Sequence, residues 1–260
     1  MKKYFFSVFA FAALVFSSCS TCGTSGLHVS YSSDSETEVS TRDIRGFEKV
    51  DVIGSPTVYY TQADSFFVRV KGPKDLVSNI ITEVEGNTLS IRNKGKIGVF
   101  NVNLGGDKGL AVYVSSPDLV GVNVFGSGDF ISEGRVDTDV IDIQLKGSGD
   151  VLFKDLICDR CNADLVGSGD LDIKHLDTRS TSATVIGSGD LDIRQMNAVN
   201  TDLTLRGSGD INIEFISGCG SVNAELRGSG DITLKGRVKN MNQQKSGSGD
   251  IDTSRLRIGE

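Results

Sequence analysis

The tetrapeptide Gly-Ser-Gly-Asp occurs seven times between residues 126 and 250. Successive copies are separated by 21, 20, 20, 20, 21 and 19 residues. A fixed period near twenty residues is typical of a solenoid, and repeats made of paired helices need longer units. The first glycines of the seven copies are Gly126, Gly147, Gly167, Gly187, Gly207, Gly228 and Gly247.

Apolar and polar residues alternate on both sides of each tetrapeptide. Around Gly167, for example, Ala163 and Leu165 precede the corner, and Leu171 and Ile173 follow it. A period of two predicts strands with one inward row of side chains. One coil cannot bury that row alone, but stacked coils convert equivalent positions into continuous apolar ladders. We therefore predict an all-β chain folded as a parallel β-helix, right-handed because parallel crossovers have that default hand.

A degenerate copy of the unit precedes the regular ones. Residues Val50–Val58 align with Val122–Phe130, and Pro56-Thr57 replaces the Gly-Asp of the later corner. Strand-like runs lie between the two copies. We expect residues 42–120 to form an irregular β-rich N-terminal part of the folded domain and residues 121–260 to form the regular β-helix.

The last coil differs from the others at its inward positions. Gln243, Lys245 and Thr253 stand there, where earlier coils carry mostly apolar residues. A solenoid needs a polar terminal coil to stop open-ended strand pairing. These residues therefore predict a cap at the C-terminal end.

The Gly-Ser-Gly-Asp corner has two interpretations. Glycines allow positive φ at a tight bend, and aspartate supports turns through side-chain to backbone hydrogen bonds. Alternatively, the aspartates form an acidic column bridged by a cation such as calcium, which prefers oxygen ligands. The structural turn is favoured, because the motif lacks the nine-residue period of calcium β-rolls. The column comprises Asp129, Asp150, Asp170, Asp190, Asp210, Asp231 and Asp250.

The N-terminus predicts export. Lys2 and Lys3 precede an apolar run of 13 residues, Tyr4–Phe16. This run is too short to span a bilayer and fits the apolar region of a signal peptide.

The run ends in Ser17-Ser18-Cys19, which resembles the lipobox of bacterial lipoproteins. That resemblance implies cleavage before Cys19 and acylation of its side chain; ordinary cleavage beside a free cysteine is the alternative. We expect residues 1–18 to be a lipoprotein signal peptide and residues 19–41, rich in Ser, Thr and Gly, to be a flexible tether. The lipid would hold the protein to a membrane.

The charge and the scarcity of histidine limit the partners and the chemistry. The chain carries a formal net charge of −7, so we expect no nucleic-acid partner. It has two histidines, His28 and His175, which leaves little room for a histidine-rich metal site. We expect no metal centre and no cofactor, apart from the calcium alternative above.

Cys158 and Cys161 form a Cys-x-x-Cys pair. In an oxidising envelope such a pair is a candidate disulfide or a redox site. Both cysteines fall in columns that hold small or apolar residues in other coils, and a buried cysteine behaves as a small hydrophobe. Packing or a passive disulfide is therefore favoured over redox activity.

β-Helices also carry polysaccharide lyases and hydrolases, which need carboxylates converging in one groove. The outward column seven residues after each first glycine instead mixes charges of both signs. Tryptophan is absent and the chain has five tyrosines, so we expect no aromatic platform and no catalytic residues. A cleft formed by residues 93–110 is the alternative left open. The mixed column reads Glu133, Lys154, Lys174, Arg194, Glu214 and Lys235.

Several outward positions of the early coils are apolar, and the same columns turn polar in later coils. Such a face is either covered by residues 42–120, which we favour, or exposed to a partner. Self-association into a homo-oligomer through it is the next alternative. The candidate interface residues are Phe125, Ile131, Leu152, Val166 and Ile186.

Several segments resemble the family called putative auto-transporter adhesin, head GIN domain, over residues 42–258. They are Arg45-Gly46-Phe47, Gly54-Ser55, the run Glu83–Ile91, Ser116-Pro117-Asp118-Leu119 and the Gly-Ser-Gly-Asp ladder. The resemblance implies a β-helical cell-envelope protein of Gram-negative bacteria.

We therefore expect a non-enzymatic, lipid-anchored outer-membrane lipoprotein that acts as an adhesin or binding module. Its surface or envelope ligand is unknown, and the membrane face, periplasmic or external, is undecided. The alternatives are a periplasmic structural or scaffold lipoprotein and, below it, a carbohydrate-active β-helix enzyme.

Overall fold

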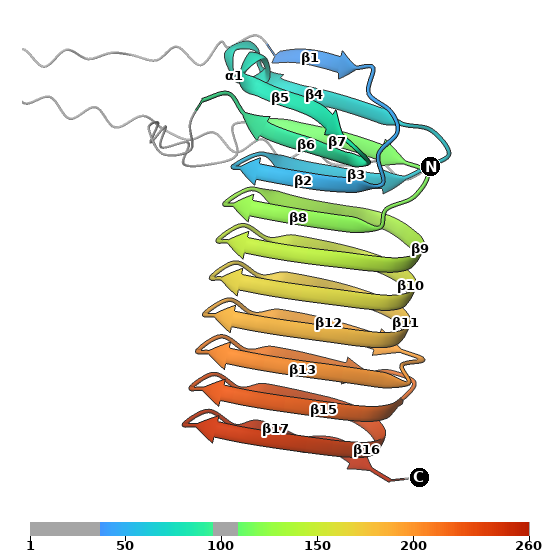
Figure 1. The fold of residues 1–260 in the computed structure, drawn as a ribbon, viewed down its shortest axis with the longest axis vertical. Coiled ribbons are helices and arrows are strands. Elements are labelled where there is room, and N and C mark those ends of the chain that lie inside the picture. Colours follow the sequence, from blue (N-terminus) through green and yellow to red (C-terminus); the bar gives the residue numbers. More distant parts are fainter. Residues whose placement is uncertain (1–36, 96–108, 260) are drawn as a thin grey trace, which may run out of the picture. The chain divides into compact units, whose positions relative to one another are not determined.

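The computed structural model describes residues 37–95 and 109–259 of the chain. The predicted signal peptide, Cys19 and the tether up to residue 36 lie outside the described residues. Within the described part, the chain forms a β-solenoid of about seven turns, about 20 residues apart (Figure 1). This confirms the fold class expected from the repeat.

The regular turns consist of strands that stack in parallel on the preceding turn and are separated by the Gly-Ser-Gly-Asp corners. In β9, β10 and β11 one continuous element runs from one corner to the next. The strands are β8 (Gly121–Gly126), β9 (Asp129–Gly147), β10 (Val151–Gly167), β11 (Leu171–Gly187), β12 (Leu191–Met196), β13 (Asn200–Gly207), β14 (Ile211–Phe215), β15 (Cys219–Gly228), β16 (Ile232–Gly247) and β17 (Ile251–Ile258).

Equivalent positions of successive repeats pair directly across these strands. Leu171 pairs with Val151 of the preceding turn, and Val185 pairs with Leu165. All four side chains are buried to 1% exposure or less, as the alternation predicts. One continuous core therefore runs along the stack.

The degenerate copy of the repeat forms a turn of the same solenoid. Strand β2 (Lys49–Gly54) pairs in parallel with β8, and β3 (Thr57–Gln62) pairs in parallel with β9. Val50 lies opposite Val122 and Gly54 lies opposite Gly126, which confirms the alignment made from the sequence.

The next turn outward comes later in the sequence. Strand β6 (Thr88–Asn93) pairs in parallel with β2, and β7 (Ala111–Ser116) pairs in parallel with β3. The β2–β3 turn therefore lies between β6–β7 on one side and β8–β9 on the other. In this stacking order β3 and β7 lie side by side, although their paired residues are more than 50 positions apart in the sequence.

Antiparallel strands end the stack beyond β6 and β7 (Figure 1). Strand β4 (Phe67–Pro73) pairs with β7, β5 (Ile80–Glu85) pairs with β6, and helix α1 (Lys74–Asn79) connects β4 to β5. Strand β1 (Thr37–Arg42) pairs antiparallel with β4.

Residues 37–41 were expected to belong to the flexible tether, and the structure corrects this boundary, because they lie in β1. The segment Thr37-Glu38-Val39-Ser40-Thr41 contains three β-branched residues, and the edge of β4 offers backbone groups that need partners.

The C-terminal end of the stack is polar. Gln243 and Lys245 are exposed, Thr253 is half-buried, and the Lys245 ammonium donates a hydrogen bond to Asp250. These residues occupy inward positions of the last turn, where no further turn covers them within the described residues. The arrangement agrees with the predicted cap.

Candidate functional site

Both glycines of each corner lie against the backbone of the preceding turn, and only the first one also has a positive φ. Gly147 has a φ of 145°, in the region that favours glycine, whereas Gly149 does not lie in that region. A Cβ atom on Gly147 would lie 1.9 Å from the carbonyl oxygen of Gly126, and a Cβ atom on Gly149 would lie 1.8 Å from the carbonyl oxygen of Gly128, both in the preceding turn. The sequence explained both glycines by positive φ; the second one is required by the close approach of stacked backbones.

The corner aspartates form a hydrogen-bonded ladder. The backbone N–H of each of the six aspartates after Asp129 donates to the carboxylate of the aspartate one turn earlier, over 2.7 to 3.1 Å. At the start of the ladder, the hydroxyl of Thr57 donates to the carboxylate of Asp129. These bonds support the structural interpretation of the motif. No cluster of three or more metal-ligating side chains occurs among the described residues, and calcium binding by the column stays a prediction.

Four of the six residues in the outward charged column form ion pairs across turns. Lys154 lies 3.1 Å from Glu133, and Arg194 lies 2.9 Å from Glu214. All four side chains are substantially exposed, so each pair contributes little to stability. This column is a solvated face of neighbouring opposite charges.

Cys158 and Cys161 face the interior as free thiols. The Cys158 side chain is 5% exposed and the Cys161 side chain is completely buried. The side-chain hydrogen bond with Cys158, together with burial, raises the pKa of the Cys161 thiol well above its ordinary value. A disulfide between them stays a prediction.

The five candidate interface residues lie on two different faces. Phe125, Val166 and Ile186 share one outward column before the corner, whereas Ile131 and Leu152 pair with each other on the face after it. Val166 is 37% exposed and Ile186 is 40% exposed. The expected coverage by residues 42–120 is therefore wrong for these two, because the described strands of that segment stack on the end of the solenoid.

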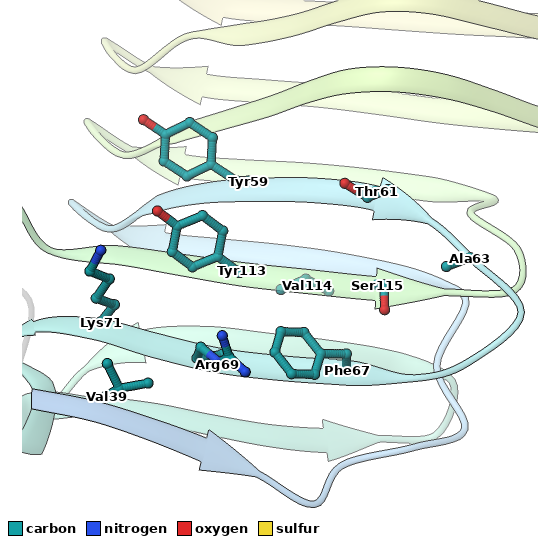
Figure 2. A pocket seen from close by; sticks show the side chains of 10 residues that line it. All are labelled: Val39, Tyr59, Thr61, Ala63, Phe67, Arg69, Lys71, Tyr113, Val114 and Ser115. Carbon is teal, nitrogen blue, oxygen red and sulfur yellow. The ribbon is translucent and has the colours of Figure 1, made fainter.

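The structure forms an open pocket that the sequence did not predict. It has a volume of about 540 Å³ and lies on the outer face of β1, β4, β7 and β3 (Figure 2). The lining residues are Val39, Tyr59, Thr61, Ala63, Phe67, Arg69, Lys71, Tyr113, Val114 and Ser115.

An aromatic pair lines part of this pocket. Tyr59 of β3 and Tyr113 of β7 are direct partners in the parallel register, and their rings stack with centroids 5.4 Å apart. Figure 2 shows both hydroxyls pointing the same way. The expectation of no aromatic platform is therefore wrong. The sequence signal was weak because these tyrosines precede the regular repeats, and the insertion between β3 and β7 hides their pairing.

Two cations of β4 lie on the Tyr113 side of the aromatic pair. The guanidinium of Arg69 lies 4.6 Å from the centroid of the Phe67 ring, which is cation–π geometry. Arg69 and Lys71 are exposed, and within the described part of the chain neither forms an ion pair. The pocket thus combines aromatic faces, hydroxyls and two positive charges, which are groups suited to binding.

Along the stretches that the structure describes, no helix has the length and apolarity needed to cross a membrane.

Solved structures share this architecture. A putative adhesin from Bacteroides fragilis is 25% identical, with a TM-score of 0.73, covering 86% of this chain and 97% of that chain. A putative lipid binding protein from Parabacteroides distasonis is 19% identical, with a TM-score of 0.62 and coverage of 87% and 98%. A putative adhesin from Parabacteroides merdae is 17% identical, with a TM-score of 0.64 and coverage of 84% and 98%.

No curated protein matches the chain. The family model described as putative auto-transporter adhesin, head GIN domain, matches residues 46–218, which include the aromatic pair and both cations of the pocket. The chain therefore belongs to the putative auto-transporter adhesin, head GIN domain family.

Proposed function

We propose that this chain is a non-enzymatic, lipid-anchored binding module of the cell envelope, of the adhesin type. The observation that carries this proposal is the pocket around Tyr59 and Tyr113, because it displays aromatic and cationic groups on the outer face of a rigid sheet. Rigid presentation limits the entropy lost on binding. Membership of a family described as adhesins supports the same assignment.

The proposed anchor is an acyl group on Cys19. The motif Ser17-Ser18-Cys19, which follows an apolar run, supports this anchor. The Ser-, Thr- and Gly-rich tether from residue 20 onward would separate the pocket from the lipid surface. A Cys19→Ala variant should lose acyl labelling and leave the membrane fraction. A variant that keeps its membrane association and its label would contradict the anchor.

The membrane face is tested by protease treatment of intact cells. The chain would carry a tag after Glu260, and cells with a permeabilised outer membrane would serve as the control. We expect the tag to be lost from intact cells, since an adhesin acts at the cell surface. Protection until permeabilisation would favour the alternative, a periplasmic structural or scaffold lipoprotein.

The proposal also predicts binding without turnover. Purified protein incubated with polysaccharides should retain them without releasing new reducing ends. Release of reducing ends that persists after further purification and disappears with a pocket variant such as Tyr113→Ala would favour the carbohydrate-active enzyme instead.

A further inference from the structure

The Tyr59–Tyr113 pair belongs to a longer outward column. In the strand register, Arg69 of β4 pairs with Tyr113, Tyr113 with Tyr59, Tyr59 with Ile131 and Ile131 with Leu152. Five neighbouring strands therefore place one cation, two aromatic rings and two aliphatic side chains in a row. At about 4.8 Å per strand, the row is about 19 Å long. We call these five residues the binding stripe.

The charge along this column is uneven. On the strand that follows, β11, the residue that pairs with Leu152 is Asp172, so the first carboxylate of this column lies five strands from Arg69. In the neighbouring column Lys71 is followed by Ala111, Thr57 and then Asp129, three strands away. None of the ten residues that line the pocket is acidic. In a chain of net charge −7, this end of the stripe is a local positive site.

Unpaired cations select an anionic ligand. An arginine binds a carboxylate or sulfate group through paired N–H donors, and Phe67 beneath Arg69 holds the guanidinium in place. The tyrosine rings provide apolar faces with polar tips, which suit a ligand that has both apolar and hydroxylated faces. A sugar ring that carries an acidic group has this combination.

The shape of the site favours an elongated ligand lying on the surface. The pocket is open along the sheet, whereas an acyl chain requires an enclosed apolar cavity that buries most of it (Figure 2).

We propose that the binding stripe, with Lys71 beside it, binds an acidic polysaccharide, a uronate- or sulfate-bearing glycan. An acidic group of the glycan would pair with Arg69 and Lys71, and successive sugar rings would pack on Tyr113 and Tyr59 toward Ile131 and Leu152. This inference rests on the proposed function, because it names the ligand class of the same pocket.

The test is a binding titration of the purified full chain with polygalacturonate and with dextran sulfate. Uncharged dextran is the matched neutral probe. We expect both polyanions to bind and dextran to bind at least roughly tenfold more weakly, because the charge-assisted pairs would be missing. Failure of both polyanions to bind, or equal binding of dextran, would overturn the assignment.

Matched variants place the binding on the stripe. Arg69→Gln with Lys71→Gln should weaken polyanion binding roughly tenfold or more. Arg206→Gln with Lys239→Gln removes two exposed cations elsewhere on the solenoid and should leave the affinity near that of the wild type. An equal loss of polyanion affinity in both double variants would show that binding depends only on general charge attraction, and it would overturn the assignment of the site to the binding stripe.

The aromatic contribution has its own variants. Tyr113→Phe keeps the ring and should retain binding, whereas Tyr113→Ala should weaken it roughly tenfold with an unchanged unfolding transition. Equal affinities of the two variants would contradict stacking.

Vesicles of phosphatidylglycerol test a lipid headgroup as the source of the anion. Vesicle binding that is as strong as polyanion binding and is lost in the Arg69/Lys71 variant would overturn the saccharide assignment. These measurements use purified protein, so their outcome is separate from the protease experiment that tests surface location.

Discussion

The backbone N–H of Asp170 donates a 3.0 Å hydrogen bond to the carboxylate of Asp150, one turn earlier in the solenoid. The same bond repeats along the corner, so each carboxylate stabilises the backbone of the following turn. The carboxylates of this column repel one another, but each one also accepts a backbone hydrogen bond that joins two successive turns.

Removal of one carboxylate from this ladder should destabilise the fold modestly. Asp170→Ala leaves the N–H of Asp190 without its side-chain acceptor, and we expect a loss of about 1 kcal/mol in the free energy of unfolding, because this corner is open to water. Asp170→Asn keeps an acceptor oxygen and should lie close to the wild type. Urea unfolding measures both, and equal stability of the alanine variant and the wild type would contradict the role of the ladder.

The second corner glycine should not tolerate a methyl group. Gly149→Ala would place a Cβ atom 1.8 Å from the Gly128 carbonyl oxygen, so the turns must separate. We expect a loss of about 3 kcal/mol or more in the free energy of unfolding, or failure to fold. Gly134→Ala is the matched control, since open space surrounds that position, and its effect should stay within about 1 kcal/mol. Similar stabilities of the two variants would refute the close-approach argument.

Tyr60 should make stability fall at high pH. Burial, the largest cause, raises the pKa of its hydroxyl to about 12 despite the hydrogen bond with Ser116. In the unfolded chain the phenol ionises near pH 10, so the folded state retains the proton between about pH 10 and about pH 12, and stability decreases as the pH rises through this window.

The size of this effect is about 3 kcal/mol across the full window. Urea unfolding of the wild type and of Tyr60→Phe at several pH values isolates it, because the phenylalanine variant lacks the titrating group. Parallel pH profiles for the two proteins would rule out the contribution of Tyr60.

Cys158 and Cys161 should resist alkylation in the folded protein. Both thiols are buried, and the raised pKa of Cys161 keeps it protonated near neutral pH. Iodoacetamide followed by peptide mass analysis should modify them slowly in buffer and rapidly in urea. Rapid modification of the native protein would contradict their burial, and recovery of the pair as a disulfide from cells would show that the envelope oxidises it.

The polar last turn should prevent end-to-end association. Gln243→Val with Lys245→Leu extends the apolar columns of the preceding turn to an exposed end, so we expect larger species in sedimentation velocity than for the wild type. Gln244→Leu changes the neighbouring outward position and serves as the control. An unchanged distribution for the double variant would show that these residues do not act as a cap.

The sequence by itself determined the solenoid, its period, its inward rows and the register of the degenerate first copy. These follow from local alternation and from a repeat that pairs each residue with its equivalent about twenty positions away, as Val50 pairs with Val122 across the longer insertion. The seven identical corners were also evident from the repeat, but the reason for the second glycine, a Gly128 carbonyl oxygen that leaves no room for a Cβ atom on Gly149, came from the stacked turns.

The tertiary structure alone decided the candidate site. Tyr59 and Tyr113 lie 54 positions apart and outside the period, and they meet because β7 returns to pair with β3 before the chain continues to β8. Likewise, β4 reaches this face in the antiparallel sense and brings Arg69 beside Tyr113. Non-local pairing leaves no periodic trace in a single sequence, so the stripe becomes visible only when the strands are in register.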